Sequence, residues 1–214
     1  MISFDRGEAL RYMGYHGAEP DAAVAESLER CAAELQAAVQ PKSISARFPL
    51  SFTGENTMQI GDLTVTSANL ARNLRGCTEV YLMAATLGIG ADRLIARASA
   101  VRMSDAVILQ AVAAAMIETC CDEVNDALRH MAEREGLYCR PRFSPGYGDF
   151  SIEHQRDFSR LLDTPRKIGL TVTESCLLAP IKSVTAVIGL SSEKQDCHRK
   201  GCEECGKTDC NFRR

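Results

Sequence analysis

Residues 45–65 read SARFPLSFTGENTMQIGDLTV, and this stretch carries the first evidence for the fold. Apolar and polar residues alternate over 45–52 and again over 58–65, which is the pattern of strands with one buried face. Residues 54–56 (GEN) separate the two runs and are typical of a turn. The stretch therefore predicts two strands joined by a short loop.

Helices and further strands flank this pair without a regular order. Helical spacing of apolar residues predicts a helix over 20–39, and Ser67 can cap a short helix over 68–74. Residues 79–86 (EVYLMAAT) predict a buried strand, after which two helices follow. Because strands and helices do not alternate as βαβ units, we expect an α+β fold with a mixed or antiparallel sheet and helices packed against it.

The longer of those two helices is expected over about 104–135. Its apolar residues recur at helical spacing and predict the face that packs in the core: Leu109, Val112, Met116, Cys120, Val124, Leu128 and Met131. The Met and Cys residues in this stripe are expected to pack as ordinary core side chains.

Composition limits the function. The 214 residues are 45% hydrophobic and carry a net charge of -3, which is ordinary for a globular protein and gives no long-range attraction to nucleic acid or anionic lipid. The absence of Trp also argues against a base-stacking surface. The N-terminus lacks the apolar segment of a signal peptide, and the apolar run 106–121 is shorter than the roughly 20 residues that span a bilayer. We therefore expect a cytoplasmic protein without nucleic-acid or membrane partners.

The residue composition changes after Gly136. Residues 140–150 (RPRFSPGYGDF) are too rich in Pro and Gly for a helix or a central strand and predict an irregular loop. Beyond it we expect a helix over 151–162 and strands over 170–173 and 183–190, joined through a turn around Pro180.

The 140–150 loop has the features of a ligand-binding loop. Arg142 can grip a carboxylate with two hydrogen bonds, and Gly146 and Gly148 let the backbone approach a ligand closely. Pro145 stiffens the loop, and Tyr147 adds a flat face with a polar tip. These features suit a small ligand with a carboxylate and an aromatic ring. A rigid surface turn with a solvated arginine is the alternative, and it is favoured when the loop is taken by itself.

Several motifs occur in order beyond this loop: Arg142-x-x-x-Gly146-Tyr147, Glu153-His154, residues 170–176 (LTVTESC) followed by Pro180, and residues 183–185 (SVT). Together they resemble the activation domain of vitamin B12-dependent methionine synthase. Residues 8–15 (EALRYMGY) look like the short, free-standing members of that family.

The resemblance implies that the loop binds S-adenosylmethionine. Arg142 would hold the methionyl carboxylate, and Ser144, Gly146 and Tyr147 would contact the ligand partly through their backbone atoms. Glu174 is a further candidate. His154 is expected to cap or pack rather than to take part in chemistry.

The resemblance also implies the role. The chain would be an auxiliary component of a methyltransferase in methionine biosynthesis, rather than a complete enzyme, and no catalytic residue is expected. It would serve the reductive remethylation of cob(II)alamin carried by a methionine synthase that lacks its own activation domain. A flavodoxin- or ferredoxin-like protein would supply the electron.

Four of the ten cysteines crowd into the C-terminal tail: Cys197, Cys202, Cys205 and Cys210. Their spacing predicts one metal site, either structural zinc or an iron–sulfur cluster. We therefore divide the chain into an activation-like domain over 1–190 and a linker with a metal-binding tail over 191–214. The other six cysteines are expected to be reduced and buried.

Two other functions remain open at this stage. The tail could make the chain an iron–sulfur electron-transfer protein that reduces corrinoid proteins, with the Arg142 loop purely structural. With zinc in the tail, it could be a protein-binding module.

Overall fold

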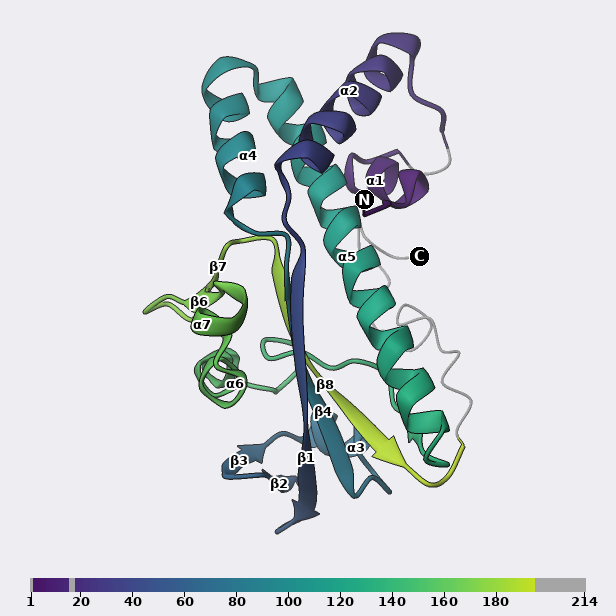
Figure 1. Cartoon of the computed structure of the whole chain (residues 1–214), viewed down its shortest axis with the longest axis vertical. Helices are drawn as coiled ribbons and strands as arrows, with labels where there is room; N and C mark the ends of the chain where they lie inside the picture. Colours follow the sequence, from purple (N-terminus) through teal and green to yellow (C-terminus); the bar gives the residue numbers. More distant parts are fainter. Residues whose placement is uncertain (1, 16–17, 195–214) are drawn as a thin grey trace.

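The computed structural model describes residues 2–15 and 18–194. Its centre is a six-stranded antiparallel sheet in the order β3-β2-β1-β4-β8-β5 (Figure 1). The strands are β1 (Lys42–Phe52), β2 (Thr57–Ile60), β3 (Leu63–Thr66), β4 (Glu79–Thr86), β5 (Tyr138–Cys139) and β8 (Ser183–Ser191). A separate two-stranded sheet pairs β6 (Thr171–Val172) with β7 (Leu178–Ala179).

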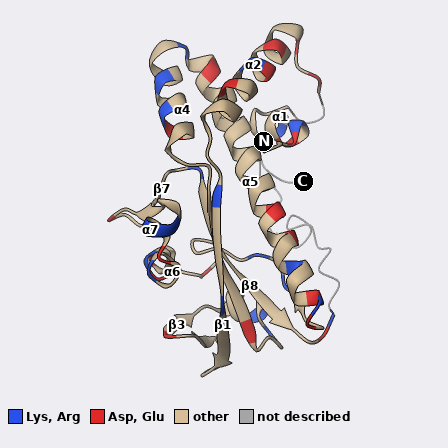
Figure 2. Cartoon of the chain, in the orientation of Figure 1, with Lys and Arg blue, Asp and Glu red and all other residues tan. Residues whose placement is uncertain are grey.

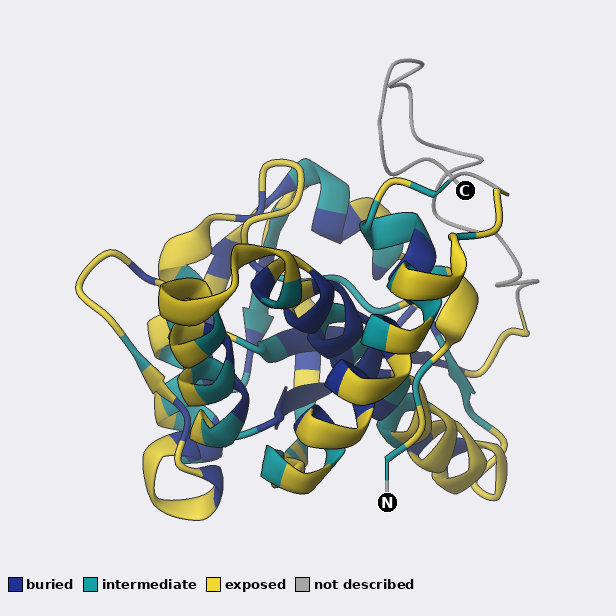
Figure 3. Cartoon of the chain, turned by 90° about the horizontal axis from the view of Figure 1, so that it is seen from above, coloured by how far each residue is buried: buried dark blue, intermediate teal, exposed yellow. Residues whose placement is uncertain are grey.

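The helices are α1 (Arg6–Tyr12), α2 (Ala22–Ala38), α3 (Ala68–Asn73), α4 (Ile89–Val101), α5 (Met103–Glu133), α6 (Gln155–Leu162) and α7 (Thr164–Ile168), with a 3-10 turn, η1 (Ile152–His154). Helices thus pack against a mainly antiparallel sheet, and the predicted α+β class is confirmed. Buried segments lie inside the molecule and the outer faces of the helices are exposed (Figure 3).

The central strand β4 is covered on both faces. Tyr81, Met83 and Ala85 pack toward one core, and the alternate residues of β4 pack toward the other. Seven of its eight residues are buried, because a strand between two helical layers has no solvent-facing side. The predicted buried strand over 79–86 is confirmed with the same bounds.

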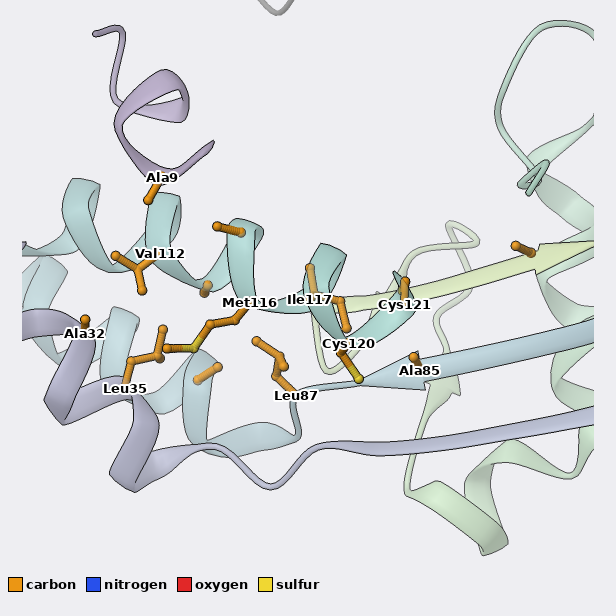
Figure 4. Packing of buried hydrophobic residues seen from close by; sticks show 14 of the residues in the cluster. Ala9, Ala32, Leu35, Ala85, Leu87, Val112, Met116, Ile117, Cys120 and Cys121 are labelled. Carbon is orange, nitrogen blue, oxygen red and sulfur yellow. The ribbon is translucent and has the colours of Figure 1, made fainter. Parts of the chain in front are cut away.

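One layer consists of α1, α2, α4 and α5, which share a core with β4 and β8. Figure 4 shows Met116 of α5 reaching between Leu35 of α2 and Leu87, and Cys120 and Cys121 lie one turn further along α5. Most of the predicted stripe is buried or partly buried, Leu128 included, but Met131 is 45% exposed and the neighbouring Ala132 is buried instead. In its last turns, α5 therefore packs only a narrow face against the core.

The other layer consists of α3, α6 and α7, which share a core with β2, β3 and β4. Phe150 and Phe158 fill its centre, with ring centroids 6.3 Å apart, and both are almost fully buried. Ser67 accepts a hydrogen bond from the backbone N–H of Leu70 (3.0 Å), so the predicted cap of α3 is confirmed.

The single strand predicted over residues 58–65 is wrong. Residues 58–65 form not one strand but the hairpin of β2 and β3, whose closing pair is Ile60 and Leu63. Gly61 has φ +60°, a conformation that glycine adopts without the strain of a side chain, and it forms the two-residue turn with Asp62.

The region after α6 also departs from the sequence prediction. The strand expected over 170–173 pairs with β7 rather than joining the large sheet, and α7 forms over Thr164–Ile168, where no helix was predicted. The strand expected over 183–190 is β8, which pairs with β4 and β5.

Among the described residues, α5 is the one helix long and apolar enough to cross a membrane. However, 61% of its most apolar window is buried inside the protein, which is typical of a core helix.

Candidate functional site

The 140–150 loop is held against the edge of β8. The backbone N–H of Arg140 donates to the carbonyl of Gly189 (2.8 Å), and Phe143 and Val187 exchange two backbone hydrogen bonds of 2.9 Å. Arg142 lies between these two attachments, so its backbone is fixed at the sheet edge next to α5. The loop is irregular, as the sequence predicted.

Arg142 meets two carboxylates of α5. Its Nη2 donates to Asp122 Oδ1 (2.8 Å) and lies 3.4 Å from Glu118 Oε2, while the Arg142 side chain is 22% exposed. Its Nη1 is buried and has no hydrogen-bond partner among the described residues. Figure 2 shows acidic and basic segments close together along the lower half of α5.

Sequence reasoning missed Glu118 and Asp122 as partners of Arg142. Two acids four residues apart on a helix share one face, and this spacing was the available signal. Their partner lies 20 or more residues away in sequence, so only packing reveals it.

The turn after Arg142 depends on two glycines. Gly146 has φ +96° and donates its N–H to the carbonyl of Phe150 (2.7 Å), while Tyr147 donates to the carbonyl of Ser144 (3.2 Å). Gly148 has φ +55°, and a Cβ there would lie 2.7 Å from the amide nitrogen of Asn69. The turn leaves the Tyr147 side chain 69% exposed, so its ring is available to a ligand.

Asp149 fastens this turn to the start of α3. Its carboxylate accepts hydrogen bonds from the backbone N–H groups of Ala68 (2.7 Å) and Asn69 (3.1 Å), from the Asn69 side chain (3.0 Å) and from the Ser67 hydroxyl (2.5 Å). These hydrogen bonds, that of Ser67 above all, hold the pKa of Asp149 well below its ordinary value. The turn is therefore anchored to α3 as well as to β8.

The predicted residues fall into two groups. Arg142, Ser144, Gly146 and Tyr147 lie together in one loop. Glu174 lies instead in the turn between β6 and β7, where its side chain is exposed and its carbonyl accepts from Arg156 Nη2 (2.6 Å). His154 packs its ring against Phe150 and lies 2.9 Å from Asp157 Oδ2, which fits the predicted packing role.

The cysteines of the described residues do not form a metal site. Cys31, Cys77, Cys120, Cys121 and Cys176 are buried, and Cys139 is partly buried. No group of three or more His, Cys, Asp or Glu residues within 2–15 and 18–194 is arranged to hold a metal ion. The predicted ligands Cys197, Cys202, Cys205 and Cys210 lie outside the described residues.

No protein-family model matches the sequence, and no curated protein matches it either. The fold, however, is similar to a solved structure, the MetH reactivation domain bound to AdoHcy (S-adenosylhomocysteine), with a TM-score of 0.66. The two sequences are 16% identical, and the match covers 90% of this chain and 75% of that one.

Proposed function

Since this chain has the fold of a methionine synthase reactivation domain, we propose that it binds S-adenosylmethionine at the Arg142 loop and acts as a reactivation module for a cobalamin-dependent methionine synthase. The observation that carries the proposal is the fold match over 90% of the chain to a domain described with AdoHcy bound. S-adenosylmethionine differs from AdoHcy only by the methyl group on its sulfur.

The charges around Arg142 suit this ligand. S-adenosylmethionine carries a carboxylate, an ammonium and a positive sulfonium. The planar guanidinium of Arg142 matches the carboxylate, and its buried Nη1 has a hydrogen bond still to donate. Glu118 and Asp122 hold the guanidinium in place and add negative charge beside it for the cationic part of the ligand.

The turn at Gly146 and Tyr147 suits the rest of the ligand. The two positive-φ glycines, Gly146 and Gly148, expose the backbone without a Cβ, and the exposed Tyr147 ring offers a flat apolar face. Because the turn is attached to β8 and to α3, its shape is fixed before a ligand arrives. Ser144 and Glu174 remain candidates for contacts with the ligand.

When bound, S-adenosylmethionine supplies an electrophilic methyl group that cob(II)alamin takes up with one electron from a donor, leaving S-adenosylhomocysteine. The role of the Arg142 loop in this proposal is to bind S-adenosylmethionine and to orient its methyl group, because positioning is what the protein contributes to such a reaction. We further propose that a methionine synthase without its own reactivation domain carries the cobalamin and that a flavodoxin- or ferredoxin-like protein donates the electron.

Calorimetry with S-adenosylmethionine tests the binding site. Arg142→Ala should weaken binding by about 2–5 kcal/mol, as expected for truncating one partner of a buried charge pair. Arg72→Ala, on the exposed side of α3, is the matched control and should bind like the parent. If Arg142→Ala folds normally and binds with parental affinity, the loop is scaffolding.

The role requires a second experiment. The chain should transfer the labelled methyl group of S-adenosylmethionine to cob(II)alamin on a truncated methionine synthase in the presence of an electron donor. Electron transfer without any need for S-adenosylmethionine would instead support the reductase alternative.

The tail adds a separate proposal, namely that Cys197, Cys202, Cys205 and Cys210 bind one metal centre. A segment this short has too little apolar surface to order itself, so the metal would supply its folding energy. Changing Cys202 and Cys205 together to Ser should release the metal and leave S-adenosylmethionine binding intact. Anaerobic purification with iron and zinc quantification distinguishes a cluster from a zinc site, and four freely alkylated thiols with neither metal would refute the proposal.

A further inference from the structure

Arg140 is the only charged residue that is buried within 2–15 and 18–194, with 3% of its surface exposed. Its side chain runs across Gly189 of β8, where a Cβ would lie 3.1 Å from Arg140 Cγ. The same Cβ would lie 2.7 Å from Cys77 Sγ and from Leu74 Cδ2, so the glycine makes room for the side chains packed on β8, the aliphatic part of Arg140 among them. A guanidinium does not deprotonate in a protein, so the charge is permanent.

This charge has no counter-charge in the described part of the chain. Arg140 Nη2 donates to the carbonyl of Arg75 (3.2 Å), and its Nε is buried without a partner. No ion pair joins Arg140 to any described carboxylate, whereas Arg129 and Arg142 nearby are both paired. A carbonyl carries only part of a charge, and a buried ion without a counter-ion is strongly destabilising. Arg140 therefore has a buried donor, Nε, that no described residue satisfies.

A small cavity lies beside Arg140. It measures about 210 Å³ and is lined by Asp122, Asn125, Arg129, Cys139, Arg140, Pro141 and Arg142, which we call the Arg140 pocket. Two of its arginines carry a buried guanidinium nitrogen without a partner, Nε of Arg140 and Nη1 of Arg142. Asn125 and Arg129 bring further donors from α5.

We propose that the Arg140 pocket binds a small oxyanion, a carboxylate or a phosphate group, that neutralises Arg140. Both groups have oxygen acceptors that suit several guanidinium donors at once. The oxyanion is either the carboxylate of S-adenosylmethionine or a free phosphate. The proposal does not depend on S-adenosylmethionine binding, because the uncompensated charge of Arg140 is present without that ligand.

Thermal unfolding of the full chain with inorganic phosphate tests this site, with chloride at equal ionic strength as the reference. Phosphate should raise the Tm of the parent, because an anion that binds only the folded state stabilises it. Asn125→Asp adds a second carboxylate to the pocket beside Asp122, which is already paired with Arg142. The variant should therefore have a higher Tm without phosphate and lose the phosphate effect. This substitution leaves the buried Arg140 unchanged, so the variant should fold.

Isothermal titration adds the affinity. Arg129→Gln removes one donor from the rim and should weaken phosphate binding by about tenfold, the value of one hydrogen bond to a charged group. Arg72→Gln, on α3 outside the pocket, is the control and should bind phosphate like the parent. Competition between phosphate and S-adenosylmethionine would identify the ligand carboxylate as the occupant, and independent binding would identify free phosphate. The proposal is overturned if phosphate has no effect beyond that of chloride, or if Asn125→Asp responds to phosphate as the parent does.

Discussion

Removing the Asp149 carboxylate should loosen the turn of the candidate site from α3. Asp149→Ala deletes all four hydrogen bonds that the carboxylate accepts, two of them from backbone N–H groups in the first turn of the helix. It also removes a negative charge from the positive end of the α3 dipole. The Gly146–Gly148 turn is then attached to the rest of the protein mainly through β8.

The loss in free energy of unfolding can be worked out from these four hydrogen bonds. A hydrogen bond to a charged group contributes about 1.5–3 kcal/mol when it is buried, but Asp149 is exposed and water replaces part of each bond. We therefore expect Asp149→Ala to lower the free energy of unfolding by about 1–3 kcal/mol, and Asp149→Asn by about half as much. In a chain of this size each kcal/mol corresponds to a fall in Tm of about 2–4 °C.

The effect should depend on pH. Because the folded-state pKa of Asp149 is lowered, its carboxylate stabilises the protein above the unfolded-state pKa of about 3.9, and this stability is lost as the pH falls toward the folded-state pKa. The parent and Asp149→Asn should therefore differ most near pH 7 and converge below about pH 4.

Urea unfolding at pH 7 and at pH 3 measures both predictions. Asp126→Asn is the matched control, because Asp126 is exposed on α5 and forms a surface ion pair with Arg129, so it should cost less than about 1 kcal/mol. A stability difference between parent and Asp149→Asn that is absent at pH 7, or unchanged at pH 3, would show that the Asp149 carboxylate does not hold the turn on α3.

Three further predictions concern the site and the two cores. Gly146→Val should abolish S-adenosylmethionine binding and leave the far-UV spectrum unchanged, because φ +96° excludes a β-branched residue; unaltered affinity in calorimetry would contradict it. Burial raises the pKa of the Cys121 thiol to about 12, so Cys121 should resist alkylation at pH 8 until the chain unfolds, and rapid native-state labelling by mass spectrometry would show otherwise. Phe158→Ala should lower the free energy of unfolding by about 3–5 kcal/mol in urea, whereas the partly buried Leu161→Ala should cost less; equal costs would argue against Phe158 as the centre of that core.

Local signals explain which parts of the fold were predictable. The strand over 79–86 and the cap at Ser67 were predicted correctly, because a continuous apolar run and a hydroxyl before a helix act within a few residues. The hairpin of β2 and β3 was missed, since alternation continues on both sides of a two-residue turn and only the backbone at Gly61 interrupts it. The pairing of β6 with β7 was not predicted either, because hydrophobic periodicity indicates a strand but not the strand with which it pairs.

The chemical character of the candidate site can be read from the sequence, because Arg142, Gly146 and Tyr147 bring a guanidinium, a flexible backbone and a ring within six residues. The neighbours of these three residues follow from the folding of the chain. Glu118 and Asp122 meet Arg142 because α5 packs beside the β8 edge, and Asp149 reaches α3 across about 80 residues of sequence. The burial of Arg140 follows from the folding as well, since its guanidinium is covered only when β8 and α3 come together. The packing of helices and strands decides which distant charges come together, so the spacing of residues along the sequence does not predict these pairs.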